Sequence, residues 1–534
     1  MTTTVIVGGV AGGMSTAARL RRRDESMEII VFEASQHVSF ANCGLPYYIG
    51  GVIPQRDSLL LQTPESLLQR FNIDVRVGHR VLNIDREAKT VTVDRHGHQI
   101  KQSYDYLVLS PGASPFVPEI PGIERALTLR TVEDVDNIVA QLTDDMNSVA
   151  IIGGGFIGVE LAENFREKGK QVTLIERGDH ILAPFDPEMA AIVMNHLRIH
   201  GIDVRTNAET TTIGSNTVEL ANGEVIAADL VIAAIGVRPE SSLAAQAGLA
   251  LGERGGIKVD AQLRTTDPAI FALGDAVEKQ DAVSGEDVLI PLAQTANRHG
   301  RLVADIITGR DTARKRTYGT AIIGVFGLAA ATVGWTEKRA RAAGKKLRVV
   351  HVHPGDHAGY YPGATQLHLK LIIDAETDQI LGAQAVGRNG ADKRIDVIAT
   401  AMQAGFTATD LADLELAYSP QYGSAKDPVN IAGMVADNRR TSEPSIQWHE
   451  LADNTLPLID VRSPEEFSNG SIPGAINIPV DELRQRIDEI PAEVVVFCQV
   501  GLRGHVATTL LSQYGRKVTN LDGGYVTYNH SQLL

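Results

Sequence analysis

The sequence predicts a multidomain α/β protein: two βαβ units with glycine-rich turns, a mixed α and β region, and a smaller final α/β unit. Three observations predict this. Glycine-rich turns lie between a buried strand and a helix at residues 8–13 and again at residues 153–158. Alternating strands and helices continue to about residue 435, and a new strand and helix pattern begins near residue 451. At 534 residues the chain is also too long for one hydrophobic core.

The first glycine turn lies close to the amino end of the chain. Strand 5–7 precedes the turn, a helix is expected over residues 14–23, and a second strand, 29–32, ends at Glu33. Glycines let the backbone approach a pyrophosphate, the helix N-terminus faces the phosphates, and the acid binds a ribose. Val10 replaces the second glycine of the usual motif, but the strand, helix and acid follow in the expected order.

The second turn carries the complete glycine motif. Strand 148–152 leads into it, a helix is expected over residues 159–168, and strand 172–175 ends at Glu176. A carboxylate here repels a 2′-phosphate and so favours NADH over NADPH, although the adjacent Arg177 weakens that preference. Two such units predict two bound dinucleotides, and the alternative is two tight turns that hold no ligand.

Cys43 is one of only two cysteines, in the segment Ser39-Phe-Ala-Asn-Cys-Gly-Leu-Pro-Tyr. A free cysteine is often a buried structural residue. The position of Cys43 just after a nucleotide-binding unit indicates instead a redox nucleophile. No second cysteine follows at the spacing of a paired dithiol. A single thiol must therefore cycle through a mixed disulfide, a persulfide or a sulfenic acid.

Cys498 directly follows the apolar strand 494–497, and Arg503 lies five positions after it. Glycines at 501 and 504 allow the loop to curl so that backbone N–H groups point at the sulfur. Such a loop stabilises a thiolate or a persulfide anion. Residues 437–450, which precede this last unit, are polar and are expected to form a linker.

Up to about residue 435 these motifs resemble the two-dinucleotide flavoprotein disulfide reductases, and residues 445–534 closely resemble a rhodanese, a sulfurtransferase domain. The resemblance implies two Rossmann-like dinucleotide-binding domains, for FAD and NADH, an α+β dimerisation domain and an α/β rhodanese domain. The expected boundaries are residues 1–112 and 251–325 for the FAD-binding domain, 113–250 for the NADH-binding domain, 326–436 for the dimerisation domain, 437–450 for the linker and 451–534 for the rhodanese domain.

The resemblance also implies cofactor-binding residues. For FAD these are Gly8, Val10, Ala11, Gly12, Gly13, Glu33, Asn42, Gly112, Gly274, Asp275 and Ala293. For NADH they are Gly153, Gly155, Gly158, Glu160 and Glu176. Glu160 would lie near the nicotinamide, and the alternative for it is a solvated helix charge.

The segment around Cys43 is similar to the single-cysteine branch of the family, which includes coenzyme A disulfide reductases, persulfide reductases, NADH oxidases and NADH peroxidases. The oxidases and peroxidases typically keep a histidine in the first helix, where this chain has several arginines instead. Guanidinium groups match phosphate oxygens, although a solvated basic helix face is the alternative. By resemblance, the coenzyme A contacts are Ser15, Arg19, Arg22, Ser39, Asn42, His299 and Lys426.

Two tyrosines of the partner subunit are implied as hydrogen-bond donors near the Cys43 thiolate. The candidates are Tyr361 together with Tyr418 or Tyr422, and interface packing is the alternative role for them. The expected catalytic residues are therefore Cys43, Tyr361 and Tyr418 in the reductase, and Cys498 and Arg503 in the rhodanese domain. An inactive rhodanese-like binding module is the alternative for the last domain, but such modules commonly lose the cysteine that this one keeps.

Composition excludes other functions. The net charge is −15 and no lysine and arginine block stands out, which excludes nucleic acid as a partner. No signal peptide is expected, and the uncharged run 318–335 is interpreted as strand, turn and strand rather than a membrane helix. We expect a cytoplasmic homodimer without a metal site.

The fusion of the two thiol domains points to an NADH-dependent reductase of coenzyme A persulfide or polysulfide that releases hydrogen sulfide. The nearest alternative is a coenzyme A disulfide reductase that maintains the thiol pool. An NADH oxidase is a further alternative. From another class, a sulfur-carrier or redox-sensing protein would fit the same motifs.

Overall fold

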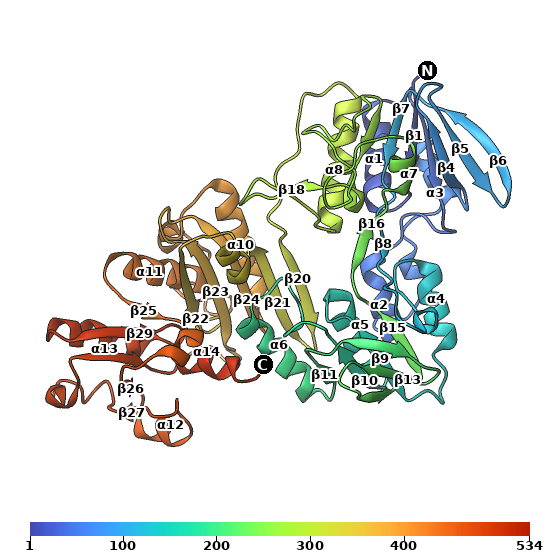
Figure 1. The fold of residues 1–534 in the computed structure, drawn as a ribbon. Helices are drawn as coiled ribbons and strands as arrows, with labels where there is room; N and C mark the ends of the chain where they lie inside the picture. The colour runs from blue at the N-terminus through green and yellow to red at the C-terminus, as the bar shows by residue number, and fades with distance from the viewer. The chain divides into compact units, whose positions relative to one another are not determined.

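The computed structural model describes residues 1–534, and contacts within the chain divide it into two compact units. The first unit consists of Met1–Arg177 and Gly201–Gly319. The second consists of Gly178–His200 and Thr320–Leu534. Figure 1 follows the chain through both. The predicted mixed α/β architecture, with two parallel-sheet units, a mixed α and β region and a smaller final α/β domain, is confirmed.

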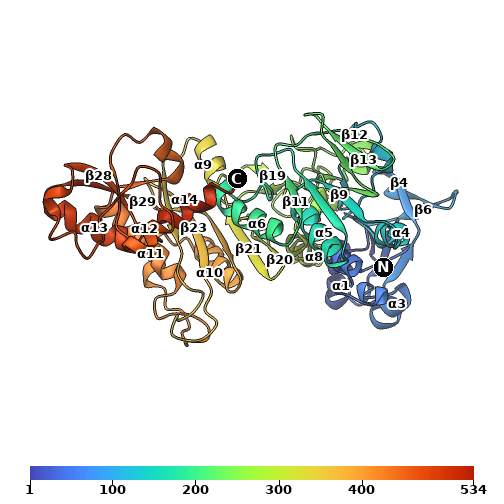
Figure 2. The ribbon, with the colours of Figure 1, turned by 90° about the horizontal axis from the view of Figure 1, so that it is seen from below.

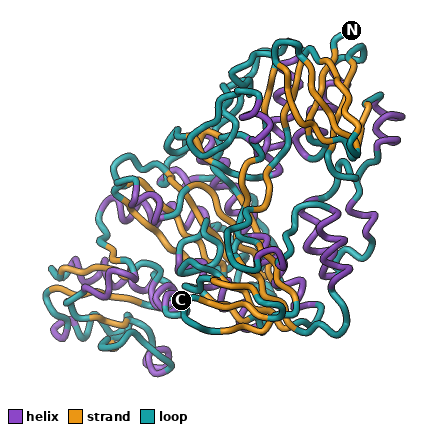
Figure 3. The backbone as a smooth tube through the Cα atoms, turned by 45° about the vertical axis from the view of Figure 1, so that its right-hand side comes forward, coloured by secondary structure: helices purple, strands orange, loops and turns teal.

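The first unit begins with a five-stranded parallel sheet in the order β17-β7-β1-β2-β3. Ile6 of β1 packs with α1 and α8 on one face, and its neighbours Val5 and Val7 pack on the other, because side chains alternate along a strand. Figure 3 shows these strands between purple helices near the N-terminus. The elements are β1 (Thr3–Val7), α1 (Ala11–Arg23), β2 (Glu28–Glu33), β3 (Asp74–Val77), β7 (Tyr106–Leu109), β17 (Ile270–Ala272) and α8 (Ala293–Ile307).

The second parallel sheet of this unit has the order β11-β10-β9-β15 and repeats the strand, glycine turn and helix arrangement. Its elements are β9 (Ser148–Ile152), α5 (Phe156–Glu167), β10 (Gln171–Ile175), β11 (Asp203–Arg205) and β15 (Leu230–Ala233). Antiparallel strands accompany both sheets: β4 (Arg80–Asp85), β5 (Thr90–Arg95), β6 (His98–Ser103), β8 (Ala113–Pro115), β12 (Thr210–Ile213), β13 (Thr217–Leu220), β14 (Val225–Ala227), β16 (Val237–Pro239), β18 (Lys279–Gln280) and β19 (Asp287–Val288). The remaining α-helices are α2 (Leu45–Gly50), α3 (Pro64–Phe71), α4 (Val132–Gln141) and α7 (Ser242–Gln246).

The second unit contains an antiparallel sheet in the order β20-β21-β24-β23-β22. Its strands are β20 (Ala321–Val325), β21 (Leu328–Gly334), β22 (Leu347–Val352), β23 (Leu367–Asp374) and β24 (Ile380–Gly387). The helices beside it are α6 (Pro187–Ile199), α9 (Glu337–Ala342), α10 (Ala391–Ala404) and α11 (Pro428–Thr441). Residues 321–325, expected in the FAD-binding domain, belong to this sheet because β20 and β21 form a hairpin.

The last domain is a parallel sheet in the order β25-β29-β28-β26-β27. Its elements are β25 (Ser445–Ile446), β26 (Leu458–Asp460), α12 (Pro464–Ser468), β27 (Ile476–Asn477), β28 (Glu493–Phe497), α13 (Leu502–Gln513), β29 (Lys517–Leu521) and α14 (Gly524–Ser531). Residues 437–450, expected as a linker, instead carry the end of α11 and the strand β25, which pairs with β29. Helix α11 and the rhodanese elements lie side by side in Figures 1 and 2.

A buried lysine holds three acids together in this second unit. The Lys370 ammonium lies 2.9 Å from Asp186, 2.6 Å from Glu188 and 2.8 Å from Glu337, and its side chain is 1% exposed. The three carboxylates are close enough to one another to ligate a metal ion, but here the ammonium group contacts each of them. Burial by itself would lower the pKa of Lys370, and the three carboxylates outweigh burial and raise it.

The same network reaches the last domain through His351 of β22. The His351 imidazole lies 3.0 Å from Glu188 and 2.6 Å from Asp522, and Arg439 also contacts Asp522 at 2.6 Å. Burial lowers the pKa of His351, but the two carboxylates raise it to about 9, so the imidazole is charged at neutral pH. Buried ion pairs therefore fix the last domain to the antiparallel sheet of the second unit.

No helix in the chain combines the length and apolar composition that crossing a membrane requires. The uncharged run 318–335 forms the strands β20 and β21, as predicted.

Candidate active site

The first nucleotide turn has a shape that only glycine fits at its main positions. Gly8 has a φ of +101°, and a Cβ there would lie 2.1 Å from the carbonyl oxygen of Ser110. A Cβ on Gly13 would lie 1.9 Å from the carbonyl oxygen of Gly8, so α1 packs directly on the turn. The Gly9 N–H donates a hydrogen bond of 2.7 Å to the Glu33 carboxylate. The acid at the end of β2 therefore lies beside the turn, where a ribose-binding acid is needed.

The second turn repeats this geometry. Gly153 has a φ of +111°, and a Cβ on Gly158 would lie 2.0 Å from the carbonyl oxygen of Gly153. The Gly154 N–H donates a hydrogen bond of 2.8 Å to the Glu176 carboxylate. A Cβ on Gly155, by contrast, would meet nothing within 4 Å. Space is thus open at the amino end of α5, where a pyrophosphate would approach the backbone.

Asp275 follows β17 in the short helix η4 (Gly274–Ala276). One oxygen of its carboxylate is buried without a hydrogen-bond partner, and the other lies 3.6 Å from the Arg130 guanidinium. A buried carboxylate oxygen without a partner is costly, so it fits a ligand that donates hydroxyl groups. The ribityl chain of FAD carries such hydroxyls, and the residues of the first turn and Asp275 together fit FAD.

Cys43 lies in the short helix η1 (Asn42–Gly44) and is exposed on one side. Protein atoms on its other side desolvate the thiol and raise its pKa, the Glu160 carboxylate raises this pKa further, and Arg130 opposes the effect. The Asn42 side chain donates a hydrogen bond of 2.5 Å to the Arg130 carbonyl oxygen and so anchors the segment. Burial therefore disfavours the thiolate, and a charged Glu160 disfavours it further.

Glu160 of α5 and Tyr47 of α2 form a pair next to this thiol. The Tyr47 hydroxyl lies 3.4 Å from Glu160 Oε1. Burial raises the pKa of Glu160 to about 7, although the hydrogen bond from Tyr47 opposes this. Burial and the Glu160 charge raise the pKa of Tyr47 to about 12. Glu160 is thus able to gain or lose a proton near neutral pH, which a surface helix charge would not do.

The rhodanese loop surrounds the second thiol. Cys498 is buried, and the Gly501 N–H donates a hydrogen bond of 3.2 Å to its Sγ. Gly501 has a φ of +100°, a conformation that favours glycine and aims this N–H at the sulfur. Arg503, at the start of α13, contacts Glu466 through two hydrogen bonds of 2.6 and 2.7 Å. The loop therefore has the N–H donor predicted for a sulfur anion.

Three protein-family profiles match the chain. The profile described as pyridine nucleotide-disulphide oxidoreductase matches residues 2–300, and the dimerisation domain of the same family matches residues 320–427. A rhodanese-like domain matches residues 444–531. The first match spans more than half of the chain. The chain belongs to the pyridine nucleotide-disulphide oxidoreductase family.

Relatives cover this oxidoreductase over most or all of its length. It is 37% identical over 438 residues to coenzyme A disulfide reductase of Staphylococcus aureus. The aligned region covers 81% of this chain and 99% of the relative. The crystal structure of reduced Bacillus anthracis CoADR-RHD is similar with a TM-score of 0.97 and 49% identity, over 99% of this chain and 98% of that one. The structure of an NAD-dependent persulfide reductase from A. fulgidus is similar with a TM-score of 0.94 and 39% identity, over 99% and 100% of the two chains.

The expected coenzyme A residues of this oxidoreductase lie in different surroundings. Ser15 and Arg19 of α1 bond to Asn297 and Asp305 of α8, at 2.7 and 2.8 Å. Arg22 is exposed. The remaining ones are Ser39, which has a positive φ of 51°, Asn42 beside Cys43, the buried His299 on another side of α8, and the exposed Lys426 of the second unit.

The expected tyrosines are exposed in the second unit, but the structure pairs them differently. Tyr418 shares a hydrogen bond of 2.7 Å with Tyr360, which sequence reasoning missed. The Gln421 side chain donates a hydrogen bond of 3.1 Å to the Tyr361 hydroxyl. Tyr422 is exposed as well. The adjacent tyrosines at 360 and 361 were the signal in the sequence, because both hydroxyls come from the same turn.

Glu466 is a further residue of the rhodanese site that sequence reasoning did not assign. Its hydrogen bonds with Arg503 lower the pKa of the Glu466 carboxyl to about 2, so both groups stay charged. The signal in the sequence was the helix-starting pattern Ser463-Pro-Glu-Glu466, in which Ser463 and Glu466 form a capping box.

Glu160→Gln is expected to make Cys43 more reactive at mildly alkaline pH. The Glu160 carboxylate is charged above about pH 7 and raises the pKa of the thiol, so its removal lowers that pKa. The rate of Cys43 alkylation by iodoacetamide, measured against pH in a Cys498→Ser background, should rise several-fold at pH 8, with its midpoint at lower pH.

Glu167→Gln is the matched control, because Glu167 is an exposed acid on the same helix. Its alkylation profile should follow that of the parent protein. An unchanged profile in Glu160→Gln would show that Glu160 does not control the thiol.

Proposed function

We propose that this chain is an NADH-dependent reductase of coenzyme A persulfide or polysulfide that releases hydrogen sulfide, and that its rhodanese domain handles sulfane sulfur. One observation carries the proposal: the chain has two free cysteines, and each lies alone in a site of its own. A lone thiol at Cys43 cannot form an internal disulfide with a neighbour. Its partner sulfur must therefore come from the substrate.

The reaction at Cys43 follows from sulfur exchange chemistry. The Cys43 thiolate attacks the sulfane sulfur of coenzyme A persulfide, the sulfur–sulfur bond of the substrate breaks, and coenzyme A leaves as a thiolate. Cys43 then carries the sulfane sulfur as a persulfide. Two electrons break this new bond, release hydrosulfide and restore the thiolate. The balance is NADH, one proton and the persulfide in, and NAD⁺, coenzyme A and hydrogen sulfide out.

FAD and NADH are the cofactors that this scheme needs, and FAD supplies the two-electron relay between NADH and Cys43. The residues of the first turn with Asp275 are proposed to hold FAD, and those of the second turn with Glu176 to hold NADH. Asn42, Gly112 and Ala293 are proposed as further FAD contacts. Glu160 is proposed to lie at the nicotinamide. Because burial raises its pKa to about 7, it is also proposed to exchange a proton near the thiol during the cycle.

Coenzyme A would bind through Ser15, Arg19, Arg22, Ser39, Asn42, His299 and Lys426. A homodimer is proposed because the region 320–427 matches a dimerisation domain. The partner subunit would then contribute the hydroxyls of Tyr361 and Tyr418 toward the reacting sulfur. The chain is proposed to act in the cytoplasm on small molecules.

The second candidate is a coenzyme A disulfide reductase, which the name of the Staphylococcus aureus relative favours. Its reaction uses the same thiol and yields two coenzyme A thiols instead of hydrogen sulfide. Comparing kcat/KM for coenzyme A persulfide and coenzyme A disulfide, by NADH absorbance with parallel sulfide detection, separates the two. Faster turnover of the disulfide would reject the persulfide assignment. Rapid NADH oxidation with oxygen alone would indicate an oxidase instead.

Cys498→Ser is expected to abolish sulfur transfer from thiosulfate to cyanide, because the buried thiol is the only sulfur in its loop that can carry a persulfide. The NADH-driven reduction of small soluble persulfides should persist at Cys43. Thiocyanate formation and NADH consumption measure the two activities. A Cys498→Ser variant that still forms thiocyanate at the parent rate would show that the rhodanese loop is not the transfer site.

A further inference from the structure

A pocket of 330 Å³ lies beside α8, between this helix and the segment that follows it. At about 100° per residue, helix geometry places Thr295, Arg298 and Leu302 on the side opposite Gly300. Gly300 packs on α1, since a Cβ there would lie 2.4 Å from the carbonyl oxygen of Gly12. The pocket therefore opens mainly on the side of α8 opposite Gly300, and its lining residue Asp305 reaches Arg19 of α1.

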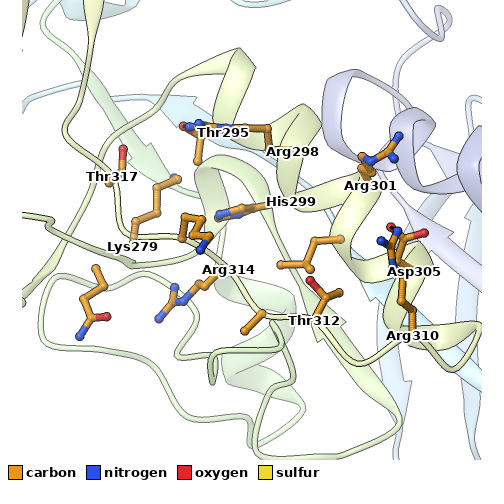
Figure 4. Close-up of a pocket in the computed structure, with 14 residues that line it drawn as sticks. Lys279, Thr295, Arg298, His299, Arg301, Asp305, Arg310, Thr312, Arg314 and Thr317 are labelled. Atoms are coloured by element: carbon orange, nitrogen blue, oxygen red, sulfur yellow. Dashed lines mark hydrogen bonds and ion pairs between the residues drawn. The ribbon is translucent and has the colours of Figure 1, made fainter. Parts of the chain in front are cut away.

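The pocket is lined by an excess of positive charge. Asp305 is the only acid in its lining, and it already contacts Arg19 at 2.8 Å and Arg310 at 3.3 Å. The cationic lining residues are Lys279, Arg298, Arg301, Arg310, Arg314 and Lys315. Figure 4 shows Lys279, His299 and Arg314 gathered at one end of the pocket, with Asp305 and Arg310 at the other. The first end has no acid of its own.

The charges at this end are bound only to backbone oxygens. The buried Lys279 ammonium donates a hydrogen bond of 2.7 Å to the carbonyl oxygen of Gly274. The Arg314 guanidinium donates to the carbonyl oxygens of Glu278 and Val259, at 2.8 and 3.4 Å. The carboxylates that act on these cations do so at longer range, Asp275 on Lys279, and Asp287 and Asp260 on Arg314. A buried cation without a close counter-ion is costly, so the buried Lys279 beside the half-buried Arg314 suits the site to an anion.

His299 supplies an independent indication of a ligand. The residue is 5% exposed, lines the pocket, and its Nδ1 has no hydrogen-bond partner. Burial, followed by the charges of Lys279, Arg314 and Arg298, lowers the pKa of His299 to about 3. Burial and Arg314 likewise lower the pKa of Lys279 to about 8, although Asp275 opposes this. An anion in the pocket would relieve both groups.

We propose that this pocket binds a phosphorylated small molecule of the size of a nucleotide, held by Lys279, Arg314 and His299 inside and by Arg298 and Lys315 at its mouth. Guanidinium groups match phosphate oxygens in pairs, and several at one place favour phosphate over a single carboxylate. A volume of 330 Å³ is at the lower end of the range for small-molecule sites. It exceeds the volume that one inorganic phosphate needs. A free nucleotide and the phosphate end of coenzyme A share this chemistry.

Pyrophosphate binding to the full-length, FAD-loaded protein tests the proposal by isothermal titration calorimetry. We expect one site per chain, with an affinity that falls as salt rises. Arg298 and Lys315 are exposed, so the double variant Arg298→Gln/Lys315→Gln should fold normally and weaken binding at least about tenfold, which is about 1.4 kcal/mol. Arg316→Gln is the matched control, because Arg316 is exposed beside Lys315 but does not line the pocket.

Absence of binding, or equal affinity in the double variant and the control, would overturn the proposal. Steady-state kinetics identify the source of the phosphate. Competition of pyrophosphate with the coenzyme A-linked substrate assigns the pocket to the phosphate end of coenzyme A, and binding without competition assigns it to a free nucleotide. The calorimetry needs no turnover, so failure of the proposed reductase reaction would not affect its result.

Discussion

Cys43→Ser is expected to reduce NADH-driven release of sulfide from coenzyme A persulfide by at least about a thousandfold. A serine hydroxyl does not form a bond to sulfane sulfur that two electrons could then break, so the relay ends before the substrate. Bound FAD should still be reduced by NADH, because that step precedes the thiol. Stopped-flow flavin absorbance and a sulfide assay measure the two halves separately.

The matched control for this prediction is Cys498→Ser, which removes the other thiol and should leave sulfide release from soluble persulfide intact. A Cys43→Ser protein that still releases sulfide at a rate close to that of the parent would refute the scheme. A protein that has lost flavin reduction as well would point to damaged FAD binding, which the flavin content of the purified variant reveals directly.

Lys370→Met is expected to lower the free energy of unfolding by about 3–5 kcal/mol, the typical cost of removing one partner from a buried ion cluster. The substitution keeps an unbranched side chain one atom shorter but leaves Asp186, Glu188 and Glu337 without their shared ammonium. Thermal and urea unfolding should both show the loss. Because those acids need a cation to stay charged, the variant should be least stable at neutral and alkaline pH and recover part of the loss as pH falls.

Lys346→Met provides the control, since Lys346 and its partner Glu376 are exposed at the surface. Its melting temperature should stay close to that of the parent, because exposed pairs contribute little. Equal stability of Lys370→Met and Lys346→Met would show that the buried cluster is not needed for the fold.

Local patterns predicted much of the fold and part of the site. Strand, glycine turn, helix and acid occur within about thirty residues in each nucleotide unit, so Glu33 and Glu176 could be paired with their turns from the sequence. The loop from Cys498 to Arg503 is also continuous in the chain. In each case the residues that act together are neighbours in sequence, and elementary backbone geometry brings them together.

Other parts depend on contacts between distant residues, which no local pattern shows. His351 and Asp522 are 171 positions apart, and Lys370 and Glu188 are 182 apart. The sequence around Lys370 in β23 gives no indication of the three acids that the ammonium contacts. His299 was assigned only by resemblance, and the cations that surround it come from β18 and from the segment after α8. The polar stretch 437–450 also looked like a linker, because its pairing partner β29 lies about seventy residues later.

Asp522 links the attachment of the rhodanese domain to the backbone around Cys498. Its carboxylate is held by His351 and Arg439, outside the rhodanese sheet, while the residues shortly after it contact the backbone of Cys498. A Cβ on Gly524 would lie 2.4 Å from the carbonyl oxygen of Cys498, and the Tyr525 N–H donates a hydrogen bond of 2.8 Å to that oxygen. The rhodanese domain is thus no independent module: excised from the chain, it would lose both cationic partners of an acid that lies next to its Cys498 loop.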